Sequence, residues 1–351
     1  IIIDDDRRVG DEGFIEGCWG TVAEQLNEDF YDDRSDGDDD MEKGRIKFPT
    51  SGKLYGREEE LEKLRGLYGE IQLHDSPSDA GTARVVFVGG YSGVGKSAVI
   101  SELVRQVEEE EHNRGDNNNI FCAQGKYSKL QAAAVPFSAI DESLGQLAAE
   151  LTKPYHEELL EKIRHKLCCD DESDIEQVMR ITFPSVSPLF STDDDDEKSN
   201  KGALSVSLDM NEVKQTFKDC LNCICSCLDS PLIWFLDDCQ WSDEASFLLL
   251  NDVLPSKDFS NILFMGSYRS NEVNDEHPFH ELMVNVEKSG VNSTARVDLF
   301  GLSPDDIGEF ISDTLGKDGA SEVSTLTEAV YAKTLGNIFF VKQALEELVR
   351  K

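Results

Sequence analysis

Four short runs of apolar residues predict the strands of this chain. They lie at 85–88, 120–123, 232–236 and 262–265 and are rich in β-branched and aromatic side chains. No polar residue interrupts any of these runs, whereas a strand with one face in water would alternate apolar and polar positions. Uninterrupted runs of this length are typical of strands buried on both faces, as in a parallel sheet that helices cover.

Longer stretches, in which apolar residues recur three or four positions apart, predict amphipathic helices. This spacing occurs at 57–67, 99–107, 137–183, 208–228, 307–315, 323–334 and 338–351. Ser303 and Pro304 supply an N-cap and a first helical position, and Gly336 follows the end of another helix. Strands that alternate with helices predict an α/β fold, and the last helices predict a small helical lid.

Shifts in composition divide the chain into three parts. Residues 1–48 are acidic and hold too few apolar residues to fold, apart from a possible helix or domain end at 14–26. We interpret this part as a solvated linker, with an acidic segment for a basic partner as the alternative. Residues 49–302 form the predicted core, with an acidic loop at 184–203. Residues 303–351 form the lid, and we expect it to be cut short because its last helix is still amphipathic where the sequence ends.

Charge and cysteine content restrict the class of protein. The 351 residues carry 34 Lys and Arg against 70 Asp and Glu, a formal net charge of −36. Such a charge repels nucleic acid and anionic membranes, so neither is a predicted partner. No stretch reaches the roughly 18 apolar residues that cross a bilayer. Nine cysteines without a secretory signal predict reduced thiols in an intracellular, cytoplasmic protein.

A glycine-rich loop joins the first predicted strand to a helix. It consists of Gly90, Tyr91, Ser92, Gly93, Val94, Gly95, Lys96 and Ser97. This is the G-x-x-x-x-G-K-[ST] pattern, in which backbone N–H groups and a helix N-terminus surround phosphate. Lys96 is then the contact for the β- and γ-phosphates of ATP, and Ser97 is a ligand of Mg²⁺. The alternative is a glycine turn that joins strand and helix by chance.

Two acids follow the apolar run at 232–236. Ligands of open α/β sheets bind at the carboxyl edge of the strands, where Asp237 and Asp238 then lie. We predict that Asp237 joins the Mg²⁺ shell and that Asp238 orients or deprotonates the attacking water. The alternative is a buried strand that ends in an acidic turn.

Arg269 ends the last apolar run and is a candidate sensor of the γ-phosphate, if its strand lies beside the strand of the glycine loop. An exposed salt-bridging arginine is the alternative. A group of cysteines at 220, 223, 225 and 227 invites a metal interpretation. Cys220, Cys223 and Cys227 fall on one helical face and no second Cys/His group accompanies them, which favours core packing.

These motifs, in this order, resemble the STAND class of signal-transduction ATPases within the AAA-type NTPases. The similar segments are 54–60 (the hhGRExE signature), 90–97, 125–127 with 135–137, 235–243, 266–273 and 334–340. The subgroup resembled is the predicted-ATPase module, related to the origin-recognition AAA proteins, of large hybrid signalling proteins. Those proteins combine it with kinase-like, GAF, histidine-kinase or cyclase domains.

The resemblance implies a P-loop NTPase sandwich with a five-stranded parallel sheet of order 5-1-4-3-2 and a helical lid. That order places Arg269 beside the phosphate loop. It also implies that Tyr55, Gly56 and Arg57 lie near the adenine. One departure is Ile338, which stands where the family usually has a proline that packs on the base.

We therefore predict an ATP·Mg²⁺-binding switch that hydrolyses ATP slowly and whose state is read by other domains of a longer protein. Nucleotide-dependent self-association is a further prediction. Three alternatives remain: a nucleotide-binding scaffold without turnover, a DNA-associated AAA ATPase and a small-molecule kinase. The DNA-associated class should carry a basic winged helix and the kinase an acceptor pocket, and neither is visible in the sequence.

Overall fold

The computed structural model describes residues 48, 53–72, 83–114, 120–130, 135–167, 175–190, 209–257, 260–290, 293–317 and 319–350. The predicted acidic linker at 1–48 therefore lies outside the described residues, except for Phe48, and so does the acidic run at 193–197. The described residues fall into two compact units. One contains 60–91 and 96–298; the other contains residues up to 59, the loop segment 92–95 and the chain from 299 onward.

Five strands form one sheet in the order β2-β3-β4-β1-β5. Their bounds are β1 Arg84–Gly90, β2 Cys122–Lys126, β3 Leu232–Asp237, β4 Ile262–Tyr268 and β5 Ser293–Leu299. The pairs β2/β3, β3/β4 and β1/β4 are parallel. This order confirms the predicted 5-1-4-3-2 arrangement. It also places the strand that precedes Arg269 directly beside the strand that enters the glycine loop.

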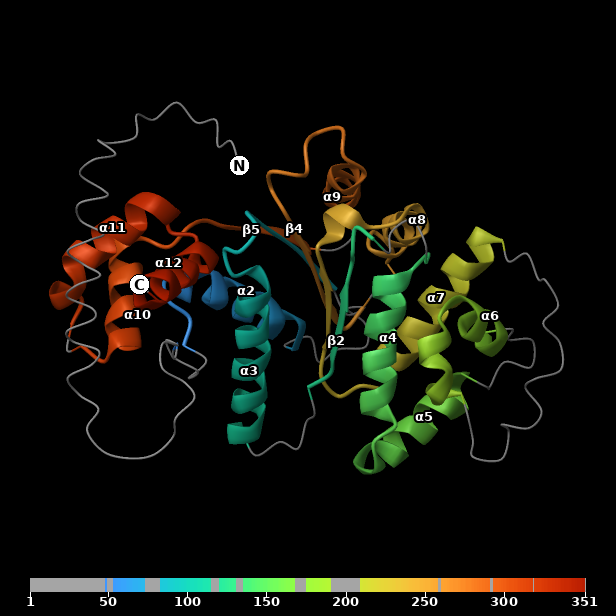
Figure 1. Ribbon diagram of the computed structural model, residues 1–351. Coiled ribbons are helices and arrows are strands. Elements are labelled where there is room, and N and C mark those ends of the chain that lie inside the picture. Colours follow the sequence, from blue (N-terminus) through green and yellow to red (C-terminus); the bar gives the residue numbers. More distant parts are fainter. Residues whose placement is uncertain are drawn as a thin grey trace. The chain divides into compact units, whose positions relative to one another are not determined.

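Helices cover both faces of this sheet, with α3 on one side and α4 on the other (Figure 1). The helices of this unit and the short 3₁₀ helices are α2 Glu58–Gln72, α3 Lys96–Arg114, α4 Ser138–Leu151, η1 Pro154–His156, α5 Glu157–Leu167, α6 Ile175–Thr182, η2 Pro184–Leu189, α7 Met210–Cys225, η3 Cys239–Trp241, α8 Glu244–Val253 and α9 Pro278–Ser289. Apolar residues of α4, α7, α8 and α9 pack with those of the strands in one continuous core.

The centre of this core holds a buried polar contact. Trp234 of β3 is 1% exposed, and its indole Nε1 donates to Ser143 Oγ of α4 at 3.0 Å. Ser143 is fully buried and donates in turn to Ile140 O. The contact therefore joins the sheet to the helix that follows β2, and it satisfies a donor that has no access to water.

We expect Ser143→Ala to lower the free energy of unfolding by about 1–3 kcal/mol, because it leaves the buried indole N–H without its acceptor. Ser101→Ala is the matched control, since Ser101 is exposed on α3. Surface changes of that kind stay within about 0.5 kcal/mol. Urea titrations of both variants measure the difference, and equal midpoints would show that the hydrogen bond contributes nothing.

The second unit has a helical core of its own. It contains α10 Pro304–Leu315, η4 Ala320–Val323, α11 Ser324–Thr334 and α12 Ile338–Arg350. Phe310, Val330 and Leu345 are among the buried residues that these helices share. The predicted N-terminus of the first helix is confirmed, because Ser303 and Asp306 form a reciprocal capping box around Pro304.

Two predicted elements differ from the structure, and one strand had no prediction of its own. The strand predicted at 120–123 lies at Cys122–Lys126, because pairing with β3 extends it past its apolar run. Strand β5 has no apolar run and only two buried positions, Val297 and Leu299, so periodicity did not reveal it. The predicted loop at 184–203 begins with η2, whose Val186 and Leu189 are buried against the core.

Candidate nucleotide-binding site

The glycine loop follows β1 and leads into α3, as its sequence predicts. Gly93 and Gly95 have φ angles of 81° and 100°, a backbone region that L-residues with side chains rarely adopt. Lys96 Nζ donates to the carbonyls of Gly90 and Tyr91, each at 3.0 Å. Burial lowers the pKa of Lys96, against the opposing effect of Asp238 and Asp237. The loop therefore holds a poorly solvated ammonium group on its own backbone.

Three successive carbonyls of the same loop accept hydrogen bonds within the second unit. Asn337 Nδ2 donates to Ser92 O at 2.8 Å, Phe339 N to Gly93 O at 3.2 Å and Arg57 Nη2 to Val94 O at 3.2 Å. A loop whose N–H groups turn toward phosphate turns its carbonyls away from it. These donors therefore hold the carbonyl groups of three consecutive loop residues.

Asp237 ends β3 and accepts four hydrogen bonds. Its Oδ1 accepts from Ser267 Oγ at 2.5 Å and from Asp238 N at 3.1 Å. Its Oδ2 accepts from Ser97 Oγ at 3.1 Å and from Lys126 Nζ at 3.0 Å. Burial by itself raises the pKa of Asp237, but these donors outweigh it and the pKa lies below its ordinary value. The carboxylate therefore stays ionised at neutral and mildly acidic pH.

Asp238 has a left-handed backbone, with a φ of 55°. Its Oδ1 accepts from Gln240 Nε2 at 2.9 Å and from Arg269 Nε at 3.2 Å. Its Oδ2 forms an ion pair with Lys126 Nζ at 3.1 Å. Strained backbone of this kind clusters at functional sites, where surrounding contacts fix it. Here three side chains fix the carboxylate on both of its oxygens.

Arg269 follows β4 and makes contacts beyond Asp238. Its guanidinium lies 4.3 Å from the ring centroid of Trp241, and its Nη1 donates to Glu272 Oε1 at 2.9 Å. Its backbone N–H donates to Gln240 Oε1 at 3.1 Å. Gln240 thus connects the ends of β3 and β4 through one amide group.

Predicted site residues therefore fall into two groups. Lys96, Ser97, Asp237, Asp238 and Arg269 lie together at the carboxyl edge of the sheet, within one unit. The predicted adenine contacts Tyr55, Gly56 and Arg57 belong to the other unit.

In that unit Tyr55 is 7% exposed and packs edge-on against Phe310, with its hydroxyl donating to Asp313 at 2.9 Å. The guanidinium of Arg57 is bound to backbone carbonyls, of Val94 and also of Phe300 at 2.5 Å. Both side chains thus have partners inside the helical unit, and their role toward adenine stays a prediction.

Sequence reasoning missed three contributors, Lys126, Gln240 and Ser267. Lys126 and Gln240 lie inside segments that carry the family resemblance, at 125–127 and 235–243. A single lysine or glutamine in such a segment does not by itself indicate a function. Ser267 is an ordinary buried strand position in the sequence. Strand pairing brings Lys126 and Ser267 to the two carboxylates, whereas Gln240 lies in η3, two positions after Asp238.

The arrangement fits a magnesium ion. Carboxylate and hydroxyl oxygens are the donors that Mg²⁺ prefers, and adjacent ligands at about 2.1 Å from an octahedral ion are about 3 Å apart. Ser97 Oγ and Asp237 Oδ2 are separated by 3.1 Å. The two side chains are therefore spaced as neighbouring ligands of one metal.

The cysteine group on α7 packs in the core instead of facing this site. Cys220 and Cys227 are buried among apolar residues as predicted, and so is Cys225, whereas Cys223 is only partly buried against this core. Cys227 lies just beyond the end of α7. Burial raises the pKa of Cys220 to about 12. Within the described parts of the chain, no three His, Cys, Asp or Glu side chains are arranged to hold a metal ion by themselves.

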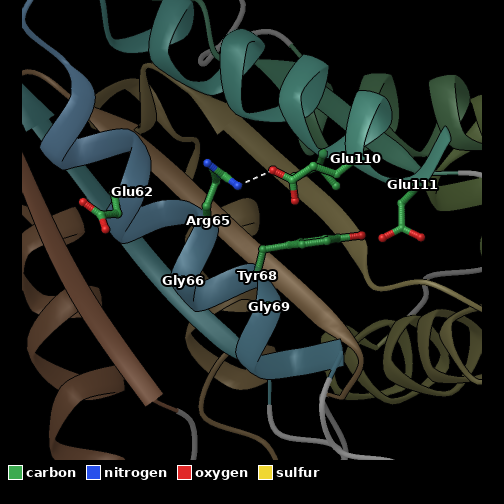
Figure 2. Close-up of a pocket in the computed structure, with 8 residues that line it drawn as sticks. Glu62, Arg65, Gly66, Tyr68, Gly69, Glu110 and Glu111 are labelled. Atoms are coloured by element: carbon green, nitrogen blue, oxygen red, sulfur yellow. Dashed lines mark ion pairs between the residues drawn. The ribbon is translucent and has the colours of Figure 1, made fainter. Parts of the chain in front are cut away.

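A surface pocket of about 330 Å³ lies between α2 and α3, apart from the edge that carries the acids (Figure 2). Arg65 of α2 forms an ion pair with Glu110 of α3 there, and Tyr68 lies alongside. None of the predicted site residues lines this pocket.

The sheet order, the glycine loop and the paired acids define a phosphate-loop nucleotide-binding fold. Residues 53–265 match a family model described as an AAA ATPase domain, and this match covers more than half of the chain. The chain therefore belongs to the AAA ATPase domain family. Comparison with curated protein sequences gave no match.

Two solved structures are similar to this chain at 13% identity. One is a STAND protein with a tetratricopeptide repeat sensor, PH0952 from Pyrococcus horikoshii, with a TM-score of 0.38 over 84% of this chain and 30% of that chain. The other is the Aeropyrum pernix ORC1 protein in complex with DNA, with a TM-score of 0.42 over 85% of this chain and 67% of that one. The chain thus spans less than a third of the STAND protein.

The prediction from net charge, that nucleic acid is not a partner, stays a prediction. In the described residues, no helix is both long enough and apolar enough to cross a membrane.

Proposed function

We propose that this chain binds ATP with Mg²⁺ at the carboxyl edge of its sheet and hydrolyses it slowly. In this proposal it is the nucleotide-controlled switch of a larger, cytoplasmic signalling protein. The observation that carries the proposal is the convergence of Lys96, Ser97, Asp237, Asp238 and Arg269 on one edge, from three neighbouring strands. The family supports nucleotide binding, while the metal, the rate and the switch are our inference.

Each side chain has a role that its geometry supports. Lys96 brings positive charge to the β- and γ-phosphates, and Ser97 with Asp237 holds the metal. Mg²⁺, when bound, would neutralise part of the negative charge of the phosphates. Asp238 accepts the proton of the attacking water or orients it, and Arg269 contacts the γ-phosphate.

The loop contacts support a switch. Phosphate binds the N–H side of the loop, and Asn337, Phe339 and Arg57 hold its carbonyl side. Any change that ATP makes in the loop backbone therefore reaches the start of α12 directly. Domains outside this chain, or a second copy of it, would read that change.

A scaffold without turnover is the second candidate, and one observation favours it. Both oxygens of Asp238 are engaged, by Gln240, Arg269 and Lys126. A carboxylate held in this way must exchange a partner before it can accept a proton from water. Calorimetry with Mg·ATP together with a phosphate-release assay distinguishes the two candidates, because a scaffold binds ATP and releases no phosphate above background. Absence of ATP binding would contradict both.

Arg269→Ala is expected to lower the affinity for ATP by about tenfold to a hundredfold, the value of a charge-assisted hydrogen bond of about 1.5–3 kcal/mol. The lower end is favoured, because Arg269 must first leave Asp238. The affinity for ADP should stay nearly unchanged, since ADP lacks the γ-phosphate. Calorimetry with both nucleotides measures the ratio.

Hydrogen exchange over 303–350 should differ between ATP and ADP in the wild type and become equal in the variant. Arg180→Ala is the control, since Arg180 also forms an ion pair, with Glu176, and lies over an aromatic ring, that of Phe190. A wild-type ATP/ADP ratio in Arg269→Ala would show that Arg269 does not contact the γ-phosphate.

A further inference from the structure

Lys126 makes a contact that the proposed function does not use. It ends β2, and the parallel register pairs it with Asp237 of β3. Register partners on neighbouring strands point to the same face of a sheet. Its ammonium group lies 3.0 Å from Asp237 Oδ2 and 3.1 Å from Asp238 Oδ2. One cation therefore bridges the two acids.

The two carboxylates divide their oxygens in the same way. Each Oδ1 faces fixed groups of β3, η3 and β4, namely Ser267, Asp238 N, Gln240 and Arg269. Each Oδ2 faces Lys126. Ser97 is the further donor to Asp237 Oδ2. The ammonium group thus lies on the oxygen that the metal would share with Ser97.

Lys126 is also a cation that can leave. Its side chain is 58% exposed, whereas those of Asp237 and Asp238 are 6% and 9% exposed. A lysine ammonium is a compact charge on a flexible four-carbon stem, unlike the planar guanidinium of Arg269, which Trp241 holds. Two buried carboxylates side by side repel each other unless a cation lies between them.

We propose that Lys126 is a built-in counter-cation of this acidic pair, which holds the pair together without metal and competes with a divalent ion for Asp237 Oδ2. This inference rests on the proposed function of the site. Lys126 and Arg269 already place two positive charges against the two carboxylates, and a divalent ion alone would add two more, so Lys126 has to leave. A nucleotide brings further negative charge, which offsets the excess. Lys126 therefore makes metal binding depend on nucleotide, and its role is that of a positioning residue.

The test measures binding of Mn²⁺, a probe for Mg²⁺, by electron paramagnetic resonance of the free ion, without nucleotide and with ADP. In Lys126→Met the affinity for Mn²⁺ alone should rise about tenfold, since a competing cation has gone. ADP should raise the Mn²⁺ affinity of Lys126→Met by about tenfold less than it raises that of the wild type. Lys126→Arg should show no gain in Mn²⁺ affinity, because it keeps the competing charge.

Lys218→Met is the matched control, since Lys218 pairs with Asp252 at 3.0 Å between α7 and α8, away from the site acids. Lys126→Gln is a second variant, which loses the charge but keeps donors for the two acids. Adding Asp237→Asn to Lys126→Met or to Lys126→Gln should remove the gained Mn²⁺ binding, which assigns the ion to this site.

A second readout is thermal stability. Without metal, Lys126→Met should melt at a lower temperature than the wild type. Mn²⁺ should raise the melting temperature of Lys126→Met by more than it raises that of the wild type. Unchanged or weaker Mn²⁺ binding in both Lys126→Met and Lys126→Gln overturns the inference. Failure of the proposed function has a different signature: the wild type would not bind Mg·ATP, whatever Lys126 does to Mn²⁺.

Discussion

Replacing Lys96 by alanine is expected to lower the affinity of the chain for Mg·ATP by about a hundredfold. The ammonium group is buried and is bound to two loop carbonyls, Gly90 O and Tyr91 O, at 3.0 Å each. Hydrogen bonds from such a group to phosphate are charge-assisted, and each is worth about 1.5–3 kcal/mol. Alanine removes two such bonds, but in the wild type ATP must first displace the ammonium group from the two carbonyls. The difference is about 3 kcal/mol, or about a hundredfold in affinity.

Calorimetry with Mg·ATP measures this change. Lys153→Ala is the control, because Lys153 pairs with Glu150 on an exposed surface of the same unit. Circular dichroism must show that Lys96→Ala is folded. A folded variant with wild-type ATP affinity would show that the glycine loop is not the phosphate site.

Replacing Asp238 by asparagine is expected to lower phosphate release by about a hundredfold or more, the usual contribution of a positioned general base. Asparagine keeps the shape of the side chain, and its carbonyl oxygen still accepts from Gln240 and Arg269. ATP affinity should change little, because the metal contact belongs to Asp237. Single-turnover phosphate release and calorimetry on the same preparation separate the two effects.

Asp237→Asn is the paired variant and should show the opposite pattern. Its Oδ2 lies beside Ser97 Oγ, so loss of its charge weakens Mg²⁺-dependent binding of ATP. Equal losses of binding in the two variants would show that the acids do not divide metal binding and water activation between them.

Local sequence was sufficient to predict the elements that are defined by residues close together in the chain. The loop at 90–97 follows from spacing alone, because strand, glycines, lysine and helix are consecutive. The position of the acids at 237 and 238 at the sheet edge was predicted correctly. An uninterrupted apolar run is typical of an interior strand of a parallel sheet, and the residues that follow it lie at the carboxyl edge. The capped helix at 304–315 followed from Ser303, Pro304 and Asp306.

Elements whose stability comes from neighbours were predicted less well. Strand β2 extends to Lys126 because β3 offers it hydrogen-bonding partners, and its own residues carry little of that signal. Strand β5 is polar on most positions, so its pairing at the end of the sheet order shows only in three dimensions. The packing of Tyr55 against Phe310 also joins residues far apart in the sequence, and no local pattern indicates it.

The sequence by itself determined the fold class, the phosphate loop and the identity of the paired acids, because each rests on residues a few positions apart. Tertiary structure alone decided what surrounds those acids. Gln240 follows Asp238 by only two positions, and η3 turns its amide back to that acid. Lys126 and Ser267 come from the strands on either side of β3, and Lys126 lies more than a hundred positions before the acid it contacts. The parallel register of β2, β3 and β4 brings them together, and that register depends on burial across the whole sheet, not on any single segment.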